Sequence, residues 1–412
     1  MKALLVPDIH LGKGTSIGKD PVGVGLNSRI EDQKNLLNFI TEYVKKNKID
    51  YINKIEYVFV MGDIWENVNP KSLVVKVFFE WIKSLTDLEC LVVIIVGNHD
   101  YIRSGQDKVS MLDSLDVLRV GNCMVVKEPT FMACFGIDLL LLPYTDRKQL
   151  EKNTHNEAVD YLKKRLHKIK EEETKHFTNK NQVSMVLGHL CLEGSLWVGD
   201  EIDEDANEIF CPLSMFDGFD QVWMGHVHKP QILKNDGKQV IGHVGSLDKT
   251  AFTGPDSTEK SMVLLEWNQV KTTKIEHTLI PLPCRPLVPI EIDIPVDCKD
   301  VDEFLYDEIS KQDVTDAIVR VTIKLGSHDS DSVDKNKIIN LLKRKNAFHI
   351  CSYKEHKPVK KVIVKNANID ETIKPEDGVK IMINTLDAED DFKKDLFIIC
   401  KDIIKEVSDS SK

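Results

Sequence analysis

A short apolar stretch that ends in polar residues constrains the fold of this chain more than any other feature. Residues 92–96 are Val-Val-Ile-Ile-Val, and Gly97 is followed by Asn98, His99 and Asp100. A short run of β-branched residues bounded by turn residues is typical of a strand that is buried on both faces, as in a sheet covered by helices. Ligands of open α/β sheets bind just beyond the carboxyl ends of the strands. The stretch therefore predicts a layered α/β fold with Asn98 and His99 at a site.

The same arrangement recurs at four other places in the chain. Apolar runs at 4–7, 57–61, 183–187 and 222–224 lead into residues that could bind a ligand, namely Asp8, His10, Asp63, His189, His226 and His228. In four of the five cases a glycine stands directly before the polar residue. Because glycine lacks a Cβ, it suits a position where the backbone and a site crowd together. We therefore expect five strand ends to meet at one site.

Helical segments alternate with these strands. A capping box at 28–31 predicts the start of one helix. A second helix after Pro70 carries an apolar face of Val74, Val77, Phe78, Trp81 and Leu85. The region from 149 to about 176 has the pattern of a long, charged helix. Alternating strands and helices are typical of βαβ units in a layered α/β domain.

The bulk composition excludes some functions. No stretch is long and apolar enough to span a bilayer, and the N-terminus lacks the basic start and cleavage site of a signal peptide, so we expect a cytoplasmic protein. The nine cysteines form no Cys-x-x-Cys pair, which argues against a zinc ribbon or an iron–sulfur cluster. The net charge of −11 is a poor match to binding nucleic acid through a basic surface alone. The negative net charge does not exclude an anionic substrate, because divalent metal ions bound in a carboxylate-lined site would make the local charge positive.

The pattern changes around 282–286, where prolines cluster and ligand-type residues become rare. Beyond this point, alternating strand and helix patterns predict a small second α+β domain, with strand 289–296, helix 302–311, strand 317–325, helix 335–344 and strand 348–353. We predict a catalytic domain over 1–282, a capping domain over 283–380 and a C-terminal helix within 381–412. That helix either packs on its own domain or binds a partner through an apolar stripe of Phe392, Leu396, Ile399 and Ile403.

The polar residues at the strand ends have the chemistry of a centre for two divalent metal ions, which needs several oxygen and nitrogen donors and a bridging carboxylate. The chain offers seven donors: Asp8, His10, Asp63, Asn98, His189, His226 and His228. Asp8 and His10 are two positions apart, as are His226 and His228, so each pair would face the same way on an extended backbone. Imidazole and carboxylate donors without thiolate suit manganese, iron or zinc in open coordination. A single buried histidine is more often a core residue, but seven donors at five predicted strand ends favour a metal site.

The complete set of motifs resembles the signature of the calcineurin-like metallophosphoesterases: Asp8-Ile9-His10, Gly62-Asp63, Gly97-Asn98-His99-Asp100, Gly188-His189 and Gly225-His226-Val227-His228. Within that superfamily the chain most resembles the SbcD-type nucleases, including their phage relatives, which work with an SMC-like ATPase on DNA ends. Finer marks are Glu193-Gly194, Lys229-Pro230, and Gly245-Ser246 before Phe252. The similarity covers 1–281, and beyond that it extends only to the order of elements. It implies an α/β fold, a four-layer αββα sandwich with a smaller C-terminal α+β capping domain.

The resemblance also implies the roles of the donors. It assigns one metal ion to Asp8, His10 and His228, the other to Asn98, His189 and His226, and the bridging position to Asp63. A water or hydroxide between the ions would attack the phosphorus. The ions would be Mn²⁺ in the first place, with Mg²⁺, Fe²⁺ or Zn²⁺ as alternatives. His99 would remain available to contact the phosphate and protonate the leaving oxygen.

Glu66 is the second candidate catalytic residue beside His99. It lies three residues after Asp63, where related enzymes place a residue that contacts the catalytic histidine. A carboxylate there would orient His99 and keep a proton on it. The alternative is a glutamate on a surface loop.

Other residues beside the motifs have simpler candidate roles. Four cations could contact phosphate oxygens, although each alone is more often a solvated surface charge: Lys13, Arg103, Lys229 and Lys249. We expect Asp100 to fix the turn that it ends. We expect His243 to line the wall of the site rather than to bind a metal.

By resemblance we expect a metal-dependent DNA nuclease in DNA end processing, repair or recombination. It would be a 3′-to-5′ exonuclease on duplex ends and an endonuclease on single strands or hairpins. Its partners would be DNA, an SMC-like ATPase and a second copy of the chain, with no membrane. The alternatives are another phosphodiesterase, for cyclic nucleotides or lipids, and a catalytically silent scaffold, which the complete donor set disfavours. A protein phosphatase is disfavoured because Glu66-Asn67 stands where those enzymes have an Asp-Arg pair.

Overall fold

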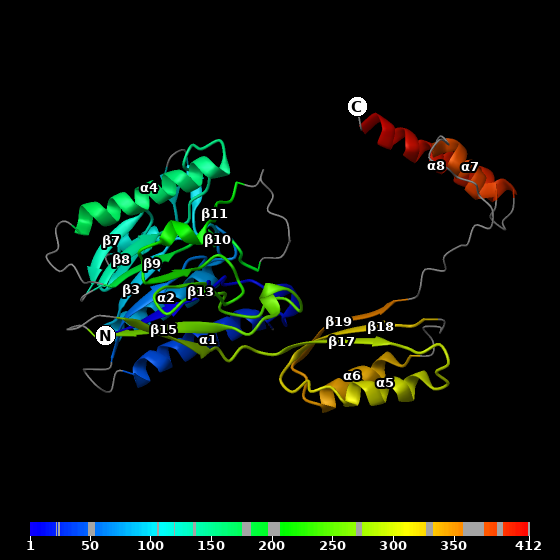
Figure 1. Cartoon of the computed structure of the whole chain (residues 1–412). Coiled ribbons are helices and arrows are strands. Elements are labelled where there is room, and N and C mark those ends of the chain that lie inside the picture. The colour runs from blue at the N-terminus through cyan, green and yellow to red at the C-terminus, as the bar shows by residue number, and fades with distance from the viewer. Residues whose placement is uncertain are drawn as a thin grey trace. The chain divides into compact units, whose positions relative to one another are not determined.

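The structure is a computed structural model of the chain. It describes residues 1–21, 23, 25–47, 54–104, 107–118, 120–134, 137–174, 183–196, 207–268, 274–326, 333–356, 375–384 and 390–410. The chain divides into two compact units, Met1–His356 and Lys357–Lys412. The centre of the first unit is a pair of six-stranded sheets, with α1 and α4 on opposite outer faces (Figure 1).

The first sheet has the strand order β16-β15-β1-β2-β3-β6. Its strands are β1 Lys2–Val6, β2 Ile55–Val60, β3 Leu91–Ile95, β6 Cys123–Val126, β15 Ser261–Trp267 and β16 Ile275–Pro281. The four strands β1, β2, β3 and β6 are parallel, and β15 is antiparallel to both of its neighbours. The carboxyl ends of β1, β2 and β3 therefore lie along one edge of the sheet.

The second sheet has the strand order β13-β14-β12-β9-β8-β7. Its strands are β7 Thr130–Cys134, β8 Ile137–Leu142, β9 Val183–Gly188, β12 Gln221–Met224, β13 Gln231–Asn235 and β14 Val240–His243. The inner strands β8, β9, β12 and β14 are parallel, and the outer strands β7 and β13 are antiparallel to them. The ends of β9 and β12 are therefore neighbours.

Alternating side chains of the strands fill a core on each side of both sheets. In β1, Ala3 and Leu5 lie in the core between the sheets, whereas Leu4 and Val6 lie in the outer core. The helices α1 Ser28–Lys46 and α2 Ser72–Asp87 pack on the first sheet through this outer core. The helix α4 His155–Thr174 packs on the second sheet. This αββα order of layers confirms the predicted four-layer α/β sandwich.

The start of α1 differs from the prediction. Asn27 is its N-cap, and the Asn27 side chain accepts a hydrogen bond from the backbone N–H of Arg29. Ser28 lies inside the helix, and its hydroxyl accepts from the backbone N–H of Lys19. The predicted capping box at 28–31 is therefore wrong by one residue, because asparagine and serine are both good caps and the loop engages Ser28 elsewhere.

The other two long helices follow their predicted patterns. All five residues predicted for the apolar face of α2 are buried. Leu162 and Leu166 of α4 are buried in the outer core of the second sheet. This helix begins at His155 rather than near Gln149, and its predicted end near His176 lies outside the described residues.

Shorter elements connect the strands. They are η1 Thr15–Ile17, β4 Ile102–Ser104, β5 Asp107–Val109, α3 Asp113–Val117, β10 Cys191–Leu192, β11 Phe210–Cys211, η2 Leu213–Phe216 and η3 Pro255–Ser257. The strands β4 and β5 form an antiparallel hairpin, and β10 and β11 form a parallel pair. The 3₁₀-helices η1 and η3 lie in the loops that follow β1 and β14.

A separate core forms in the last part of the first unit. The strands β17 Leu287–Asp293, β18 Ile318–Lys324 and β19 His349–His356 form a parallel sheet in this order. The helices α5 Val301–Ser310 and α6 Lys335–Arg344 connect them, in the predicted order of elements. Arg285 joins this part to α1, because its Nη2 lies 2.8 Å from Asp32 Oδ1. The domain boundaries drawn from the sequence stay a prediction.

The second unit contains α7 Pro375–Asn384 and α8 Asp390–Ser410. The predicted apolar stripe lies on α8, where Phe392, Ile399 and Ile403 are exposed and Leu396 is partly buried. Among the helices of the described ranges, none is long and apolar enough to cross a membrane.

Candidate metal centre

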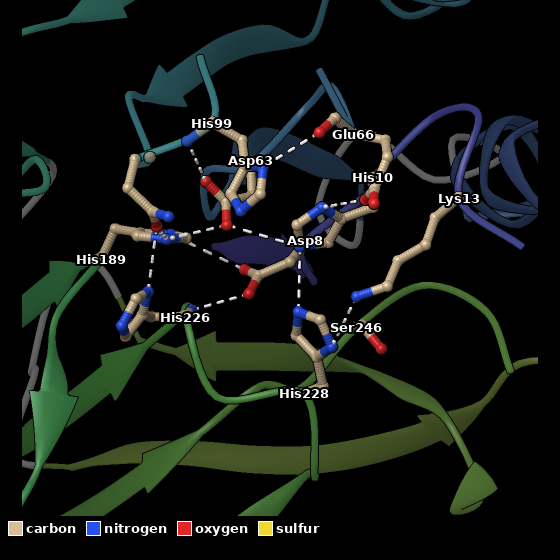
Figure 2. A network of polar contacts seen from close by, with 12 residues as sticks. Asp8, His10, Lys13, Asp63, Glu66, His99, His189, His226, His228 and Ser246 are labelled. Carbon is tan, nitrogen blue, oxygen red and sulfur yellow. Dashed lines mark hydrogen bonds and ion pairs between the residues drawn. The ribbon is translucent and has the colours of Figure 1, made fainter. Parts of the chain in front are cut away.

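The structure brings the predicted donors together from both sheets. They follow β1, β2 and β3 of the first sheet and β9 and β12 of the second. Figure 2 shows the side chains of the labelled donors pointing toward one another. The backbone N–H of His226 donates to Asp8 Oδ2 at 2.7 Å, although the two residues are 218 positions apart. This hydrogen bond joins the two sheets at the site.

Sharp turns aim several of the donors. His10, Asp63 and His226 have φ values of 46°, 47° and 79°, in the left-handed region that residues other than glycine rarely adopt. The prediction that His226 and His228 face the same way on an extended strand is wrong, because the chain turns at His226 and the two rings join different groups. Strained backbone at three donors indicates that the surrounding site holds their conformation.

The donors form two adjacent groups, in each of which three ligand atoms lie within 4.8 Å of one another. The first group is Asp8, His10 and His228, and the second group is Asp63, His189 and His226. His10 also lies within the same distance of Glu66 and His99, which are not among the seven donors. Asn98 joins the second group, because its Oδ1 lies 3.2 Å from His189 Nε2 and 3.1 Å from His226 Nδ1. All seven predicted donors therefore lie in or beside two neighbouring groups.

Asp63 stands between the two groups. Its Oδ2 lies 3.4 Å from His10 Nε2 in the first group and 3.4 Å from His189 Nε2 in the second. Its Oδ1 accepts a hydrogen bond from the backbone N–H of His99 at 2.9 Å. One oxygen of this carboxylate therefore faces both groups while the other holds the loop that carries His99.

Two features of the first group fit a divalent metal ion. Asp8 Oδ1 is buried and makes no hydrogen bond to any described residue, which is unusual for a carboxylate oxygen withdrawn from water. His10 Nε2 and His228 Nε2 face each other at 2.9 Å, while Nδ1 of each ring contacts a carboxylate. With the protons on the Nδ1 atoms, two lone pairs point at one place, which suits a cation.

Burial and neighbouring charges set the ionisation of the donors. Burial lowers the pKa of His10 to about 4, so this ring is neutral near pH 7 and its lone pair is available to a metal. Burial raises the pKa of Asp8 well above its ordinary value. Burial opposes ionisation in the second group as well, but the attraction between Asp63 and His189 dominates. It raises the pKa of His189 to about 10 and holds that of Asp63 well below its ordinary value.

Glycines before the donors leave the space that the site needs. A Cβ on Gly97 would lie 2.2 Å from Asp63 Oδ1, and a Cβ on Gly225 would lie 2.4 Å from Asp8 Oδ1. Both distances are far shorter than van der Waals contact, so the predicted crowding at these glycines is confirmed. Gly188 differs, because an added Cβ at this position would contact Leu142 of the neighbouring strand β8 and the Met224 side chain rather than a donor.

Gly97→Ala is expected to weaken Mn²⁺ binding and to destabilise the fold by about 1–3 kcal/mol, because the new methyl group would displace the Asp63 carboxylate. Gly121→Ala is the matched control, since its Cβ would have no heavy atom within 4 Å. Urea unfolding measures the stability, and calorimetric titration measures the affinity for Mn²⁺. Wild-type affinity in Gly97→Ala would contradict the placement of Asp63.

His99 is held by the backbone rather than by the predicted carboxylate. Its Nδ1 lies 3.0 Å from the carbonyl oxygen of Glu66, which can only accept, so Nδ1–H donates and Nε2 is left for another partner. The Glu66 carboxylate lies 3.3 Å from His10 Nδ1 instead, and no hydrogen bond from it to His99 is found among the described residues (Figure 2). Glu66 therefore contacts His99 as predicted, but through its backbone carbonyl rather than its carboxylate, because the loop after β2 turns the side chain toward His10.

Asp100 and His243 support the loops that carry the donors. Asp100 is fully buried, and its oxygens accept hydrogen bonds from the backbone N–H groups of Ile64 at 2.7 Å and Gly97 at 2.8 Å. It thus ties the loop after β2 to the loop after β3, as predicted for a residue that fixes the turn. His243 Nδ1 donates to the carbonyl oxygen of Gly225 at 2.9 Å, and His243 belongs to neither group.

The four predicted phosphate contacts differ in their surroundings. Lys13 reaches the first group, with its Nζ 3.3 Å from His228 Nδ1. Lys249 pairs with a glutamate ten positions later, and Lys229 is half-buried. The side chain of Arg103 lies outside the described residues. A role in phosphate contact stays a prediction for all four.

Three residues near the donors were not predicted from the sequence. Asp256 in η3 lies 2.6 Å from His228 Nδ1, and Glu208 lies 3.3 Å from His226 Nε2. Lys260 is buried and donates to the carbonyl oxygen of His228 at 3.0 Å. The donors were predicted because each lies just after an apolar strand. None of these three residues directly follows a strand of the parallel core, so the same pattern could not predict them.

Comparisons with known proteins agree with this geometry. Residues 1–230 match the family model described as calcineurin-like phosphoesterase, and all seven donors lie within the matched range. The SbcD subunit of the nuclease SbcCD from Staphylococcus saprophyticus is 24% identical over 308 residues, which are 71% of this chain and 71% of the relative.

Solved structures are similar only at a low level. A dimetal phosphatase from Danio rerio is 12% identical with a TM-score of 0.39, and the match covers 68% of this chain and 99% of that chain. A structure described as a 5′-nucleotidase from Staphylococcus aureus is 13% identical with a TM-score of 0.39 over 68% of this chain. The chain spans about half of that nucleotidase, 54% of its length. Similarities at these TM-scores carry no argument about function. The family match covers more than half of the sequence and includes every donor, so the chain belongs to the calcineurin-like phosphoesterases.

Proposed function

We propose that the chain is a metal-dependent DNA nuclease, a 3′-to-5′ exonuclease on duplex ends and an endonuclease on single strands or hairpins. The position of Asp63 carries the proposal, because one of its oxygens lies 3.4 Å from a histidine of each group. A carboxylate placed in this way can bridge two metal ions. The name of the relative, a nuclease subunit, supports DNA as the substrate. The mixed imidazole and carboxylate donors suit Mn²⁺.

Each side chain has a separate task in this proposal. Asp63 would contact both ions. One ion would also be held by Asp8, His10 and His228, and the other by Asn98, His189 and His226. Two bound divalent ions supply a water nucleophile at neutral pH and offset the charge of the phosphate. His99 keeps its Nδ1 proton hydrogen-bonded to the Glu66 carbonyl oxygen and, in its imidazolium form, transfers the second proton from Nε2 to the leaving oxygen, which leaves the ring neutral. Lys13 contacts a phosphate oxygen beside the first group.

The proposed macromolecular partners are DNA, an SMC-like ATPase and a second copy of the chain. The relative is named as one subunit of a nuclease, which supports a partner subunit. The exposed residues Phe392, Ile399 and Ile403 on α8 offer an apolar stripe on which the ATPase would dock. Light scattering of the purified chain, alone and with the ATPase, measures both associations.

The proposal is tested by incubating the purified chain and Mn²⁺ with labelled duplex DNA, labelled hairpin DNA and the small ester bis(4-nitrophenyl) phosphate. We expect both DNA substrates to be cleaved, and EDTA to stop the cleavage. Cleavage of the small ester without cleavage of DNA would point to another phosphodiesterase. Binding of Mn²⁺ without any cleavage would point to a scaffold subunit.

A further inference from the structure

We propose that Asp256 and Glu66 are positioning residues that aim the two histidines of the first group at a metal ion. Neither residue is one of the seven donors. The Asp256 carboxylate contacts Nδ1 of His228, and the Glu66 carboxylate contacts Nδ1 of His10. The inference rests on the proposed metal-dependent function and adds two residues that act through the histidines.

Asp256 makes the shorter of the two contacts. Its Oδ1 lies 2.6 Å from His228 Nδ1. An ionised carboxylate only accepts hydrogen bonds, so Nδ1 donates and the lone pair of His228 stays on Nε2. Lys13 Nζ lies 3.3 Å from the same Nδ1, but it also lies 3.5 Å from Asp256 Oδ2, so the ammonium can donate to the carboxylate.

Glu66 lies beside the other histidine of the first group, in a close electrostatic contact rather than a hydrogen bond, since neither Glu66 Oε2 nor His10 Nδ1 has a hydrogen-bond partner among the described residues. Its Oε2 lies 3.3 Å from His10 Nδ1, and Nε2 of that ring lies 2.9 Å from His228 Nε2 and 3.4 Å from Asp63 Oδ2. Figure 2 shows the two rings meeting at their Nε2 atoms. The negative charge of each carboxylate favours a proton on the Nδ1 atom that faces it, so the two Nε2 atoms, which face each other, remain available to a cation.

A buried lysine fixes the loop that carries Asp256. Lys260 is 1% exposed, and its Nζ donates to the carbonyl oxygens of His228 at 3.0 Å and Pro255 at 2.9 Å. The backbone N–H of Thr250 donates to the carbonyl oxygen of Asp256 at 3.0 Å. An ammonium group withdrawn from water is costly unless it is hydrogen-bonded, so these bonds stabilise one arrangement of the histidine and its carboxylate.

The contacts predict a measurable loss of metal affinity. Metal-binding histidines usually donate their other ring N–H to a carboxylate or carbonyl, and removing that acceptor weakens metal binding about 10–100-fold. Asp256→Ala is therefore expected to raise the Kd for Mn²⁺ by about 10–100-fold. Asp256→Asn should lose less, because its amide oxygen can still accept from His228. Glu66→Ala should also raise the Kd, although the backbone carbonyl that holds His99 remains in place.

Calorimetric titration of the full chain with MnCl₂ measures the affinity without any substrate. Glu259→Ala is the control for Asp256, since Glu259 lies three positions away and its side chain is 90% exposed. Glu80→Ala on α2 is the control for Glu66, since Glu80 is exposed and outside both groups. Melting temperatures in EDTA show whether each variant folds. If Asp256→Ala does not fold, Asp256→Asn and Glu66→Ala carry the test.

The outcomes separate this inference from the proposed function. Weaker binding in Asp256→Ala and Glu66→Ala, with partial recovery in Asp256→Asn, would support it. Affinities equal to the wild type in both alanine variants would overturn the inference and leave the proposed function intact. If the wild-type chain binds no Mn²⁺ at all, the inference and the proposed function both fail.

Discussion

Replacing Asp63 by asparagine is expected to lower the rate of Mn²⁺-dependent DNA hydrolysis on the order of 10³-fold or more. The Asp63 carboxylate is the charged group that faces both groups of donors, 3.4 Å from His10 Nε2 and 3.4 Å from His189 Nε2. The amide keeps the size of the side chain and can still accept from the backbone of His99, but it loses the negative charge. Metal ions contribute several kcal/mol to catalysis, and each 1.36 kcal/mol corresponds to about tenfold in rate.

The measurement is the initial rate on labelled duplex DNA at saturating Mn²⁺, together with the metal content of the purified variant. Asp138→Asn is the matched control, because Asp138 on β8 is also a buried carboxylate but belongs to neither group. We expect the control to keep its metal and its rate. A rate near that of the wild type in Asp63→Asn would rule out a bridging role for this residue.

Replacing His99 by glutamine is expected to lower the hydrolysis rate by about 10²–10⁴-fold, the contribution of a general acid, while leaving the affinity for Mn²⁺ unchanged. The ring is oriented by the Glu66 carbonyl oxygen at 3.0 Å. It lies close to His10 and Glu66 but belongs to neither the first nor the second group of donors. Glutamine can still donate to that carbonyl but cannot deliver a proton to a leaving oxygen.

Single-turnover rates on duplex DNA and calorimetric titration with Mn²⁺ measure the two quantities. His277→Gln on β16 is the control, since this histidine is half-buried and outside both groups. Loss of cleavage with intact metal binding would also separate an enzyme from a scaffold subunit. A loss of metal affinity in His99→Gln would instead show that the ring supports the centre itself.

The local pattern of the sequence predicted well the five strands that carry the donors and their polar ends. In β1, side chains alternate between two buried cores, and Asp8 follows the strand. Burial on both faces requires apolar residues at every position, and this requirement is visible in a short stretch of sequence. The space left by Gly97 and Gly225 was predicted for the same reason, since a missing Cβ is a local property.

Contacts of single side chains were predicted less well. Glu66 was placed near the catalytic histidine, but the loop after β2 gives His99 the backbone carbonyl of Glu66 and gives His10 its carboxylate. Asp256 was missed because it lies 28 positions after His228, in a loop whose place depends on Lys260. Sequence spacing does not determine which atoms of a loop residue face a site.

The sequence by itself determined the five strands that carry the donors, the residues that end them and the order of elements after residue 286, because these depend on the period of apolar side chains and on residue type. It did not predict β6, β7, β8 or β13 of the two central sheets. The spacing of His226 and His228 predicted that they face the same way, whereas the family resemblance assigned them to different ions; the tertiary structure turns the chain at His226 and places the two rings in different groups, with Asp63 facing both. It also decided which ring nitrogen of His10 and His228 faces Asp256 or Glu66. The reason is that a metal site depends on the directions of lone pairs, and these are set by left-handed turns and by contacts between residues far apart in the chain.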